Sequence, residues 1–325
     1  MARLAGAPMK WGIIAAALLA AACNAPGAVE RVPIPPGSTV RAAADSLAAH
    51  GVIRSTTWFR LRARVAGVSR SMRAGIYELA RGAGTTAALR ALRNGRVMDL
   101  PVTLPVGGTI FDLAHSAHDE LGLSADSVIA AAHDTALLAR YAITGPSAEG
   151  WLLPETFNFG GFDGARAVVA RFAAARRDKW DSSWTREAAA QGFDRATLLT
   201  LASIVEAEAS DSVERPLIAA VYRNRLRLRM PLQADPTIEY AYLLRDGQRK
   251  GRLYNGDYQM DSPWNTYQHA GLPPGPIDNP SRAAILATLR PAAVSYLYFV
   301  AGPDGHTLFA TTYAEQLRNI ARVRR

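Results

Sequence analysis

The sequence predicts an α+β protein in which a small strand-helix module is followed by a larger mixed α/β domain. A strand-turn-helix pattern occurs twice in the first half, and tryptophan, tyrosine and proline become more frequent after about residue 150. A chain of 325 residues with 49% hydrophobic content can build one large core or two moderate ones. We therefore expect residues 31–145 and 146–325 to form separate domains.

The repeated pattern reads VPIPPGSTVRAAADSLAAHGVI in its first copy and VTLPVGGTIFDLAHSAHDELGL in its second. Each copy has a short alternating strand, a Pro-x-Gly turn, a threonine and a helix that ends near a glycine. Thr39 and Thr109 are placed to cap the two helices. Between the copies, the pattern predicts a strand at 76–79 and a helix at 86–92 closed by Gly95.

Helices dominate the second half as far as residue 230. Residues 164–192 are helix-rich, and a further helix begins with Asp194 as its N-cap. This helix has apolar residues at 198, 201, 202 and 205, the spacing of one buried face. The segment 230–280 is rich in Pro, Gly and Asn and too long for a passive loop, so we expect it to form the wall of a cleft. Asn279 with Pro280 is expected to start the next helix.

The stretch SYLYFVAGPDGHTLFATT predicts a C-terminal hairpin that turns at 302–305. A basic helix is expected to follow it.

The N-terminus has the pattern of an export signal or membrane anchor, predicted for residues 1–30. Arg3 and Lys10 precede the uncharged stretch WGIIAAALLAAAC, which ends at the single cysteine, Cys23. This apolar run is shorter than the roughly 17–25 residues that span a bilayer. A lipidated Cys23, a retained single-helix anchor and a cleaved signal are three alternatives. All of them place the chain from about residue 30 onward outside the cytoplasm.

The net charge of +9 comes almost entirely from arginine, and no run of five or more basic residues occurs. Together with the export signal, this disfavours a nucleic-acid partner. The six histidines show no paired ligand spacing, and there is no phosphate loop or dinucleotide fingerprint. We therefore expect no metal and no cofactor.

Chemistry is expected from a carboxylate in LLTLASIVEAEAS, where Glu206 and Glu208 are two residues apart. Two such helical neighbours point about 200° away from each other, so they cannot both face one cleft. Glu206 lies beside Val205 at the edge of the buried face, where desolvation raises the pKa of a carboxyl, as a general acid requires. Glu206 is thus the candidate acid, and a solvated Glu206 at a helix boundary is the alternative. Glu208 is expected to lie on the outer face of the helix or to support the site from behind the substrate-contacting residues.

Four ordered motifs resemble the endolytic murein transglycosylases of the YceG-like family: LASIVEAEAS, VYRNRLRLRMPLQADPTIEYA, SPWNTYQHAGLPPGPIDNPS and YLYFVAGPDGHTLFATTYAEQ. The resemblance covers nearly all of the chain from about residue 32, and EGWLLPETFNF matches the opening of the family's catalytic domain. It implies that the first module is LysM-like and that the catalytic glutamate falls on Glu206. The sequence departs from the family where Glu-Ala-Glu-Ala-Ser replaces the commoner Glu-Lys-Glu-Thr.

The resemblance also implies an activity and a location. The enzyme would be a lyase that cleaves the MurNAc-GlcNAc bond of peptidoglycan glycan strands and leaves a 1,6-anhydro end. It would be held at the cell inner membrane, face the periplasm and act beside peptidoglycan synthases, controlling glycan length. A non-catalytic peptidoglycan-binding protein is the alternative.

Four residues are implied to line the substrate cleft: Gln233, Asp235, Asn265 and Tyr267. Their alternative reading is loop structure, since Asp235 before a proline and Asn265 are also good turn formers. Asp235 could also be a second carboxylate that allows hydrolysis.

Overall fold

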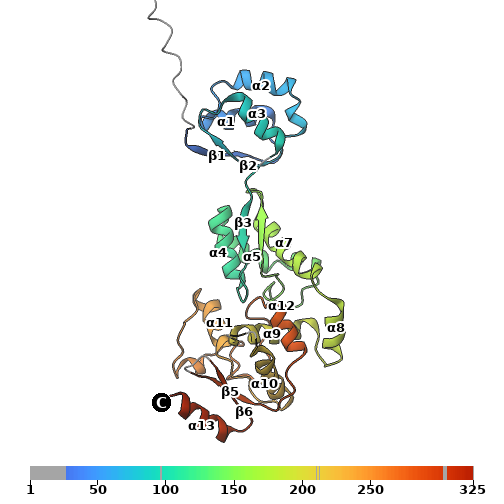
Figure 1. Cartoon of the computed structure of the whole chain (residues 1–325), viewed down its shortest axis with the longest axis vertical. Helices are drawn as coiled ribbons and strands as arrows, with labels where there is room; N and C mark the ends of the chain where they lie inside the picture. The colour runs from blue at the N-terminus through green and yellow to red at the C-terminus, as the bar shows by residue number, and fades with distance from the viewer. Residues whose placement is uncertain (1–26, 96, 210, 212, 303–305, 325) are drawn as a thin grey trace, which may run out of the picture. The chain divides into compact units, whose positions relative to one another are not determined.

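The computed structural model describes residues 27–95, 97–209, 211, 213–302 and 306–324 (Figure 1). Cys23 and most of the expected anchor segment lie outside these residues. The chain divides into two compact units between Met98 and Asp99. The expected boundary at 145/146 is therefore not where the units divide, and residues 99–145 pack with the C-terminal unit. None of the described helices is both long and apolar enough to span a bilayer.

The N-terminal unit has one antiparallel pair of strands, β1 (Val29–Ile34) and β2 (Gly75–Ala80), in which Val32 is opposite Tyr77. Its helices are α1 (Val40–Ala49), α2 (Thr56–Val65), the short 3-10 helix η1 (Val68–Arg70) and α3 (Gly84–Asn94). Thr39 caps α1 by accepting a hydrogen bond from the Ala42 amide at 3.1 Å, as expected. The unit has a hydrophobic core of its own, formed around Phe59 and Tyr77.

The C-terminal unit begins with a second antiparallel pair, β3 (Leu100–Thr103) and β4 (Thr156–Phe159). The helices of this part are α4 (Ile110–Leu121), α5 (Ala125–Ala132), α6 (Thr135–Arg140), α7 (Ala165–Asp178) and α8 (Ser182–Ala189). Thr109 and Asp112 form a capping box on α4. The second copy of the repeat, β3 with α4, thus belongs to a different unit from the first copy, β1 with α1.

The helix α9 (Arg195–Glu208) is enclosed on every side rather than along one stripe, since residues 198–206 are all buried. Leu198, Leu199 and Ala202 join the core below β3 and β4, whereas Leu201, Ile204 and Val205 join a separate core. The elements that follow are α10 (Arg215–Arg227), α11 (Asp235–Asp246), η2 (Asp257–Gln259), α12 (Arg282–Leu289), β5 (Tyr298–Ala301), β6 (Thr307–Ala310) and α13 (Tyr313–Val323). Asp194 caps α9 through the Thr197 amide at 2.7 Å.

One local expectation for the segment 230–280 needs correction. This segment contains a regular helix, α11, which begins at Asp235. Asn279 does not cap α12, because Ser281 does so by accepting a hydrogen bond from the Ala284 amide at 3.1 Å. β5 and β6 pair antiparallel, and part of the turn between them lies outside the described residues.

Candidate active site

A cavity of about 290 Å³ opens at the C-terminal end of α9. It brings together the last turn of α9, the first turn of α11, the turn of the second repeat and the segment before α12. The residues that line it are Gly107, Ala207, Glu208, Asp235, Pro236, Glu239, Arg249 and Asp278. Four of these eight residues are acidic, so the cavity is a carboxylate-rich site.

Glu208 is the last residue of α9 and contributes a half-buried carboxyl to this cavity. The Tyr222 hydroxyl, on α10, donates a hydrogen bond to its Oε1 at 2.6 Å. Burial, together with the charge of Asp235, raises the pKa of Glu208 to about 7, and the hydrogen bond from Tyr222 acts in the opposite direction. A carboxyl with such a pKa is protonated in a large fraction of molecules at neutral pH, as a general acid must be.

Asp235 and Tyr267 form a pair at the cavity. The Tyr267 hydroxyl donates to Asp235 Oδ1 at 2.6 Å, and the Tyr267 ring lies 4.7 Å from that of Tyr258. Burial and the neighbouring Asp235 raise the pKa of Tyr267, so its phenol stays protonated and remains a donor. Gln233 is exposed, and its backbone amide donates a hydrogen bond to the backbone carbonyl of Thr266 at 3.2 Å. The segments 233–235 and 265–267 are thereby joined, which supports their expected place beside one cleft.

Asn265 has a different position from the other three predicted cleft residues. Its side chain is fully buried, and its Nδ2 donates to the carbonyls of Tyr258 at 3.2 Å and Met260 at 2.8 Å. Its Oδ1 accepts from the Tyr267 amide at 3.0 Å. With both ends of the amide engaged by backbone, Asn265 shapes the loop that presents Tyr267, and the turn-forming alternative describes it better than a sugar contact.

Glu206 is buried and is not among the residues that line the cavity. Its side chain is only 5% exposed, and Arg215 Nη2 contacts Oε1 at 2.8 Å. The Ser281 amide at the N-terminus of α12 donates to Oε2 at 2.8 Å. A guanidinium and a helix N-terminus both stabilise an anion. Glu206 therefore joins α9 to α10 and α12 through both of its carboxyl oxygens. Glu208 does not lie on an outer face, which was one of the two positions expected for it, because it lines this cavity.

Two further buried acids, Glu149 and Asp278, lie close to Glu206. Glu149 accepts from Asn279 Nδ2 at 2.7 Å, from the Tyr240 hydroxyl at 3.3 Å and from the Ile110 amide. Burial raises the pKa of Glu149 to about 8. Burial, Glu149 and Glu206 also raise the pKa of Asp278, whose Oδ1 has no hydrogen-bond partner among the described residues. These two acids were not selected from the sequence, since each is isolated from other acids along the chain.

The turn of the second repeat reaches the same place through Gly107. This glycine has a left-handed φ of +68°, and its amide donates to the Asn279 carbonyl at 3.2 Å. A Cβ at this position would lie 3.6 Å from Glu206 Cγ and 3.9 Å from Asp278 Oδ2. Glycine suits the turn because an L side chain is strained at this φ.

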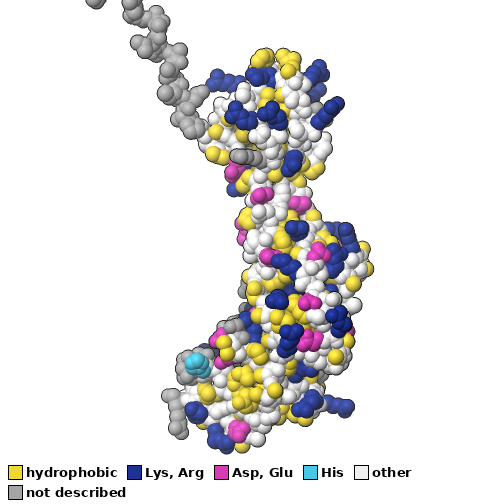
Figure 2. Space-filling view, turned by 45° about the vertical axis from the view of Figure 1, so that its right-hand side comes forward, with side chains coloured by type: hydrophobic (Ala, Val, Ile, Leu, Met, Phe, Trp, Pro, Cys, Tyr) yellow, Lys and Arg dark blue, Asp and Glu magenta, His cyan; other side chains and the backbone are white. Residues whose placement is uncertain are grey.

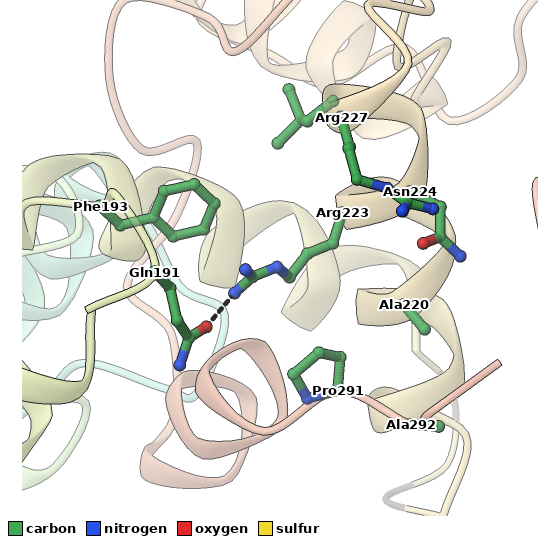
Figure 3. Close-up of a pocket in the computed structure, with 9 residues that line it drawn as sticks. Gln191, Phe193, Ala220, Arg223, Asn224, Arg227, Pro291 and Ala292 are labelled. Atoms are coloured by element: carbon green, nitrogen blue, oxygen red, sulfur yellow. Dashed lines mark hydrogen bonds between the residues drawn. The ribbon is translucent and has the colours of Figure 1, made fainter. Parts of the chain in front are cut away.

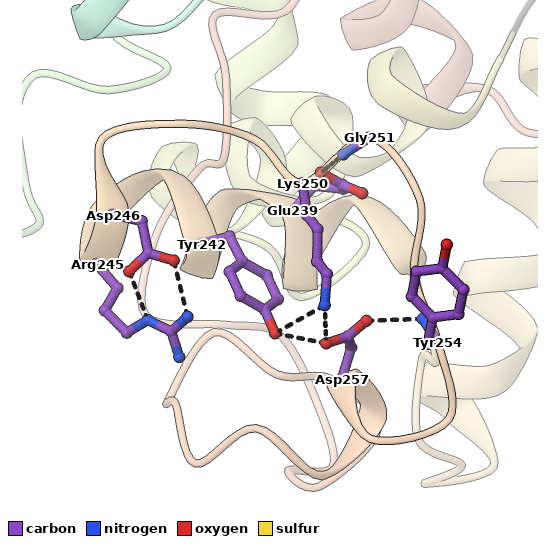
Figure 4. A network of polar contacts seen from close by, with 8 residues as sticks. All are labelled: Glu239, Tyr242, Arg245, Asp246, Lys250, Gly251, Tyr254 and Asp257. Carbon is purple, nitrogen blue, oxygen red and sulfur yellow. Dashed lines mark hydrogen bonds and ion pairs between the residues drawn. The ribbon is translucent and has the colours of Figure 1, made fainter.

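The cavity wall beyond α11 is fixed by a polar network (Figure 4). The Tyr242 hydroxyl donates to Asp257 Oδ1 at 2.5 Å, and Lys250 forms an ion pair with the same carboxylate. Lys250, followed by Tyr242, lowers the pKa of Asp257 to about 2. The Gly251 amide donates to Glu239 Oε2 at 3.0 Å. The network holds the chain on both sides of Lys250 and so positions its neighbour Arg249, the cation among the cavity-lining residues.

A second hollow of the C-terminal unit, about 450 Å³, lies between α10 and the segment after α12 (Figure 3). Arg223 donates to Gln191 there and lies 4.6 Å from the ring of Phe193. No carboxylate lines this hollow, so it lacks a proton donor. In the described ranges, no cluster of His, Cys, Asp and Glu could hold a metal ion. The α9 cavity is therefore the candidate active site.

A carboxyl with a near-neutral pKa beside a second carboxylate is an arrangement by which enzymes break glycosidic bonds. The cavity thus holds the kind of carboxyl groups that sugar-cleaving enzymes of this class use. The chain belongs to the YceG-like family, whose model matches residues 32–322.

Curated relatives agree with this membership. The endolytic murein transglycosylase of Bacillus subtilis is 32% identical over 297 residues, which cover 87% of this chain and 81% of the relative. The enzyme of the same name from Streptococcus pneumoniae is 28% identical, and the match covers 89% of this chain but only 57% of the relative. A crystal structure of a YceG-like protein from Listeria monocytogenes superposes with a TM-score of 0.63 at 28% identity, covering 89% of this chain and 98% of that one.

Proposed function

We propose that this protein is an endolytic lytic transglycosylase that cleaves the MurNAc-GlcNAc bond of peptidoglycan glycan strands. The relatives named endolytic murein transglycosylase support the reaction class. The observation that supports the chemistry most directly is Glu208, a cavity-lining carboxyl whose pKa is raised to about 7. We assign the acid to Glu208, because it lines the cavity, whereas both oxygens of Glu206 are engaged by Arg215 and Ser281. Glu206, on which the family's catalytic glutamate falls by resemblance, is the alternative acid.

The reaction needs one group that can give and then take a proton. The protonated Glu208 carboxyl donates to the glycosidic oxygen as the bond from this oxygen to the MurNAc anomeric carbon breaks. The 6-hydroxyl of the same MurNAc then closes on its anomeric carbon, and its proton passes to the Glu208 carboxylate. The products are a 1,6-anhydro end and a free GlcNAc hydroxyl, no water is consumed, and Glu208 is restored to its acid form.

Asp235 is assigned to stabilise the positive charge that develops at the anomeric carbon. Its charge is close enough to Glu208 to influence that group's pKa, and Tyr267 holds the carboxylate by a hydrogen bond of 2.6 Å. Gln233 and the ring of Tyr267 are available at the same rim for sugar contacts. If Asp235 instead activates water, the product is heavier by one water molecule, so the mass of the product distinguishes the two reactions.

The experiment is digestion of uncrosslinked glycan strands followed by mass spectrometry of the ends. We expect anhydro ends from the native chain and their loss from Glu208→Gln. Hydrated ends would refute the lyase mechanism. Strand binding without cleavage would favour the alternative of a non-catalytic peptidoglycan-binding protein.

The finer assignments are also proposals. We assign the N-terminal unit as a LysM-like module, supported by the order β1, α1, α2 and β2 around one core. We assign the protein to the inner membrane with its catalytic part facing the periplasm, near peptidoglycan synthases, where it controls glycan length. The sequence before residue 27 supports attachment there, through either Cys23 or a helical anchor. Mass spectrometry of the mature N-terminus distinguishes a lipidated cysteine from the other two alternatives.

A further inference from the structure

The outer face of α2 is apolar where the helix meets solvent. Phe59 and Ala63 face the core of the N-terminal unit and are almost completely buried. Trp58 is 53% exposed, Leu61 55% and Val65 85%. At 3.6 residues per turn, these three side chains fall within a sector of about 60° that points away from the core. They form the apolar ridge of α2.

Arginines flank this ridge on both sides. By the same helical spacing, Arg60 and Arg64 lie along one edge, and Arg62 lies along the other. The Arg62 guanidinium is 6.0 Å from the Trp58 ring. Figure 2 shows apolar side chains over the end of the unit that α2 forms, with cationic side chains around them. An apolar face bordered by arginines is the pattern of a helix that lies in a membrane interface.

A hollow of about 510 Å³ lies between the ridge and the start of α1. Arg41, Arg60 and Arg64 line it together with Thr39 and Thr57. None of these arginines forms an ion pair with a described residue of the chain, as defined by a distance of 4.0 Å between charged atoms. Unpaired guanidinium groups around a hollow suit an anionic group such as a phosphate.

The charge of the whole chain is concentrated in this unit. Residues 27–98 contain 12 arginines and 3 acidic residues, whereas residues 99–325 contain 23 basic and 25 acidic residues. The excess positive charge in the first segment equals the net charge of +9 of the entire chain. A surface that attracts the protein electrostatically therefore attracts its N-terminal unit.

We propose that the α2 face rests on an anionic phospholipid surface. The apolar ridge enters the boundary between headgroups and acyl chains, and Arg60, Arg62 and Arg64 bind lipid phosphates. A phospholipid headgroup fits the hollow beside Arg41. A neutral sugar chain fits this face less well, because Leu61 and Val65 offer it no hydrogen bond.

The position of the unit in the sequence agrees with this partner. If the proposed N-terminal attachment holds, β1 begins six residues after Cys23, and a chain of that length spans at most about 20 Å. The tether brings the unit to the bilayer, and the α2 face would determine which side of the unit meets it.

The test uses the full chain reconstituted in vesicles of phosphatidylcholine alone or of phosphatidylcholine with phosphatidylglycerol. Each vesicle type is made with and without lipids brominated on the acyl chain, which quench nearby tryptophan. The Trp58 contribution is the difference between the native chain and Trp58→Phe. We expect it to be quenched in the phosphatidylglycerol vesicles and to lose this quenching in the double variant Arg60→Gln, Arg64→Gln.

The matched control is Arg31→Gln with Arg73→Gln, which removes the same charge from exposed positions outside α2 and should leave quenching unchanged. Co-sedimentation with vesicles reports N-terminal attachment separately, and cleavage of free glycan strands should be the same in all variants. A vesicle-bound protein with unquenched Trp58 would overturn the proposal. Equal quenching of Trp58 in vesicles of phosphatidylcholine alone would overturn the role of the arginines. A Trp58 fluorescence that changes on addition of glycan strands but is not quenched by brominated lipid would overturn the lipid assignment and identify a glycan-binding surface.

Discussion

Replacing Glu208 with glutamine tests the assignment of the acid most directly. Glutamine has nearly the same shape and keeps an oxygen to accept the hydrogen bond from Tyr222. It cannot donate a proton to a leaving oxygen, so the substitution removes the chemistry while preserving the packing. Loss of a positioned general acid lowers the rate by about 10²–10⁴-fold.

The same substitution has a predicted effect on stability with a definite sign. The folded protein raises the pKa of Glu208 from 4.5 to about 7, so between these values the folded state binds more protons than the unfolded state. The stability of the native chain therefore falls as the pH rises through this window. Above it, the charged carboxyl costs at most about 3 kcal/mol, and the glutamine variant avoids this penalty. Glu208→Gln should be less active at pH 7 and more stable than the native chain at pH 8.

The assays are cleavage of uncrosslinked glycan strands and thermal unfolding. Activity is followed by the anhydro ends released per unit time, and kcat/KM of the native chain should fall as the pH rises above about 7 because the acid form is lost. Unfolding is compared at pH 5 and pH 8, and the stabilisation of the variant should appear mainly at the higher pH.

Two matched variants complete this experiment. Glu239→Gln changes another carboxylate of the same cavity and retains an acceptor for the Gly251 amide, so it should keep most of the activity. Glu206→Gln leaves the Arg215 guanidinium without its anion and should lower stability by about 3 kcal/mol. Measured at a temperature where it is folded, the Glu206→Gln variant should still be active, and its kcat/KM should still fall as the pH rises above about 7. Our reasoning is refuted if Glu208→Gln stays active while folded Glu206→Gln loses its activity.

Three further predictions follow from the contacts around the cavity. Tyr267→Phe removes the hydrogen bond to Asp235 and should lower kcat about tenfold, as expected for about 1.4 kcal/mol of lost transition-state stabilisation; an unchanged kcat would exclude this pair from the reaction. Asn265→Ala leaves three backbone groups without their partners and should lower the free energy of unfolding by about 3 kcal/mol, measured by urea denaturation. Wild-type stability would contradict its structural role. Gly107→Ala must adopt a φ of +68° and should lose about 1–2 kcal/mol in the same assay, and a smaller loss would show that the turn relaxes.

The helix starts were predictable because they depend on short-range chemistry. Thr39, Thr109 and Asp194 each cap the helix expected of them, since a cap needs only its own side chain and the amide two or three residues later. The Asn279 prediction failed because that side chain has stronger partners far away in sequence. Its Oδ1 accepts from the Leu152 amide, and its Nδ2 donates to Gly108 and Glu149.

The sequence also predicted the helix that carries both candidate acids, but it could not decide which glutamate faces the cavity. The rule of one buried stripe assumes a helix that lies on a surface, whereas α9 is enclosed by two cores and has no solvent side for most of its length. Burial next to Val205 therefore does not by itself decide between the two glutamates, because a guanidinium and a helix N-terminus contact Glu206 there.

The sequence by itself determined the family resemblance, the repeated strand-turn-helix pattern, the helix caps and the carboxylate motif, since all of these depend on residues close together in the chain. Only the tertiary structure decided that residues 99–145 pack with the C-terminal unit and that Asn265 is buried. It also decided that Glu208 rather than Glu206 lines a cavity with Asp235. The physical reason is that burial, ion pairing and the pKa of a carboxyl are set by groups from distant segments, which the order of residues does not bring together until the chain folds.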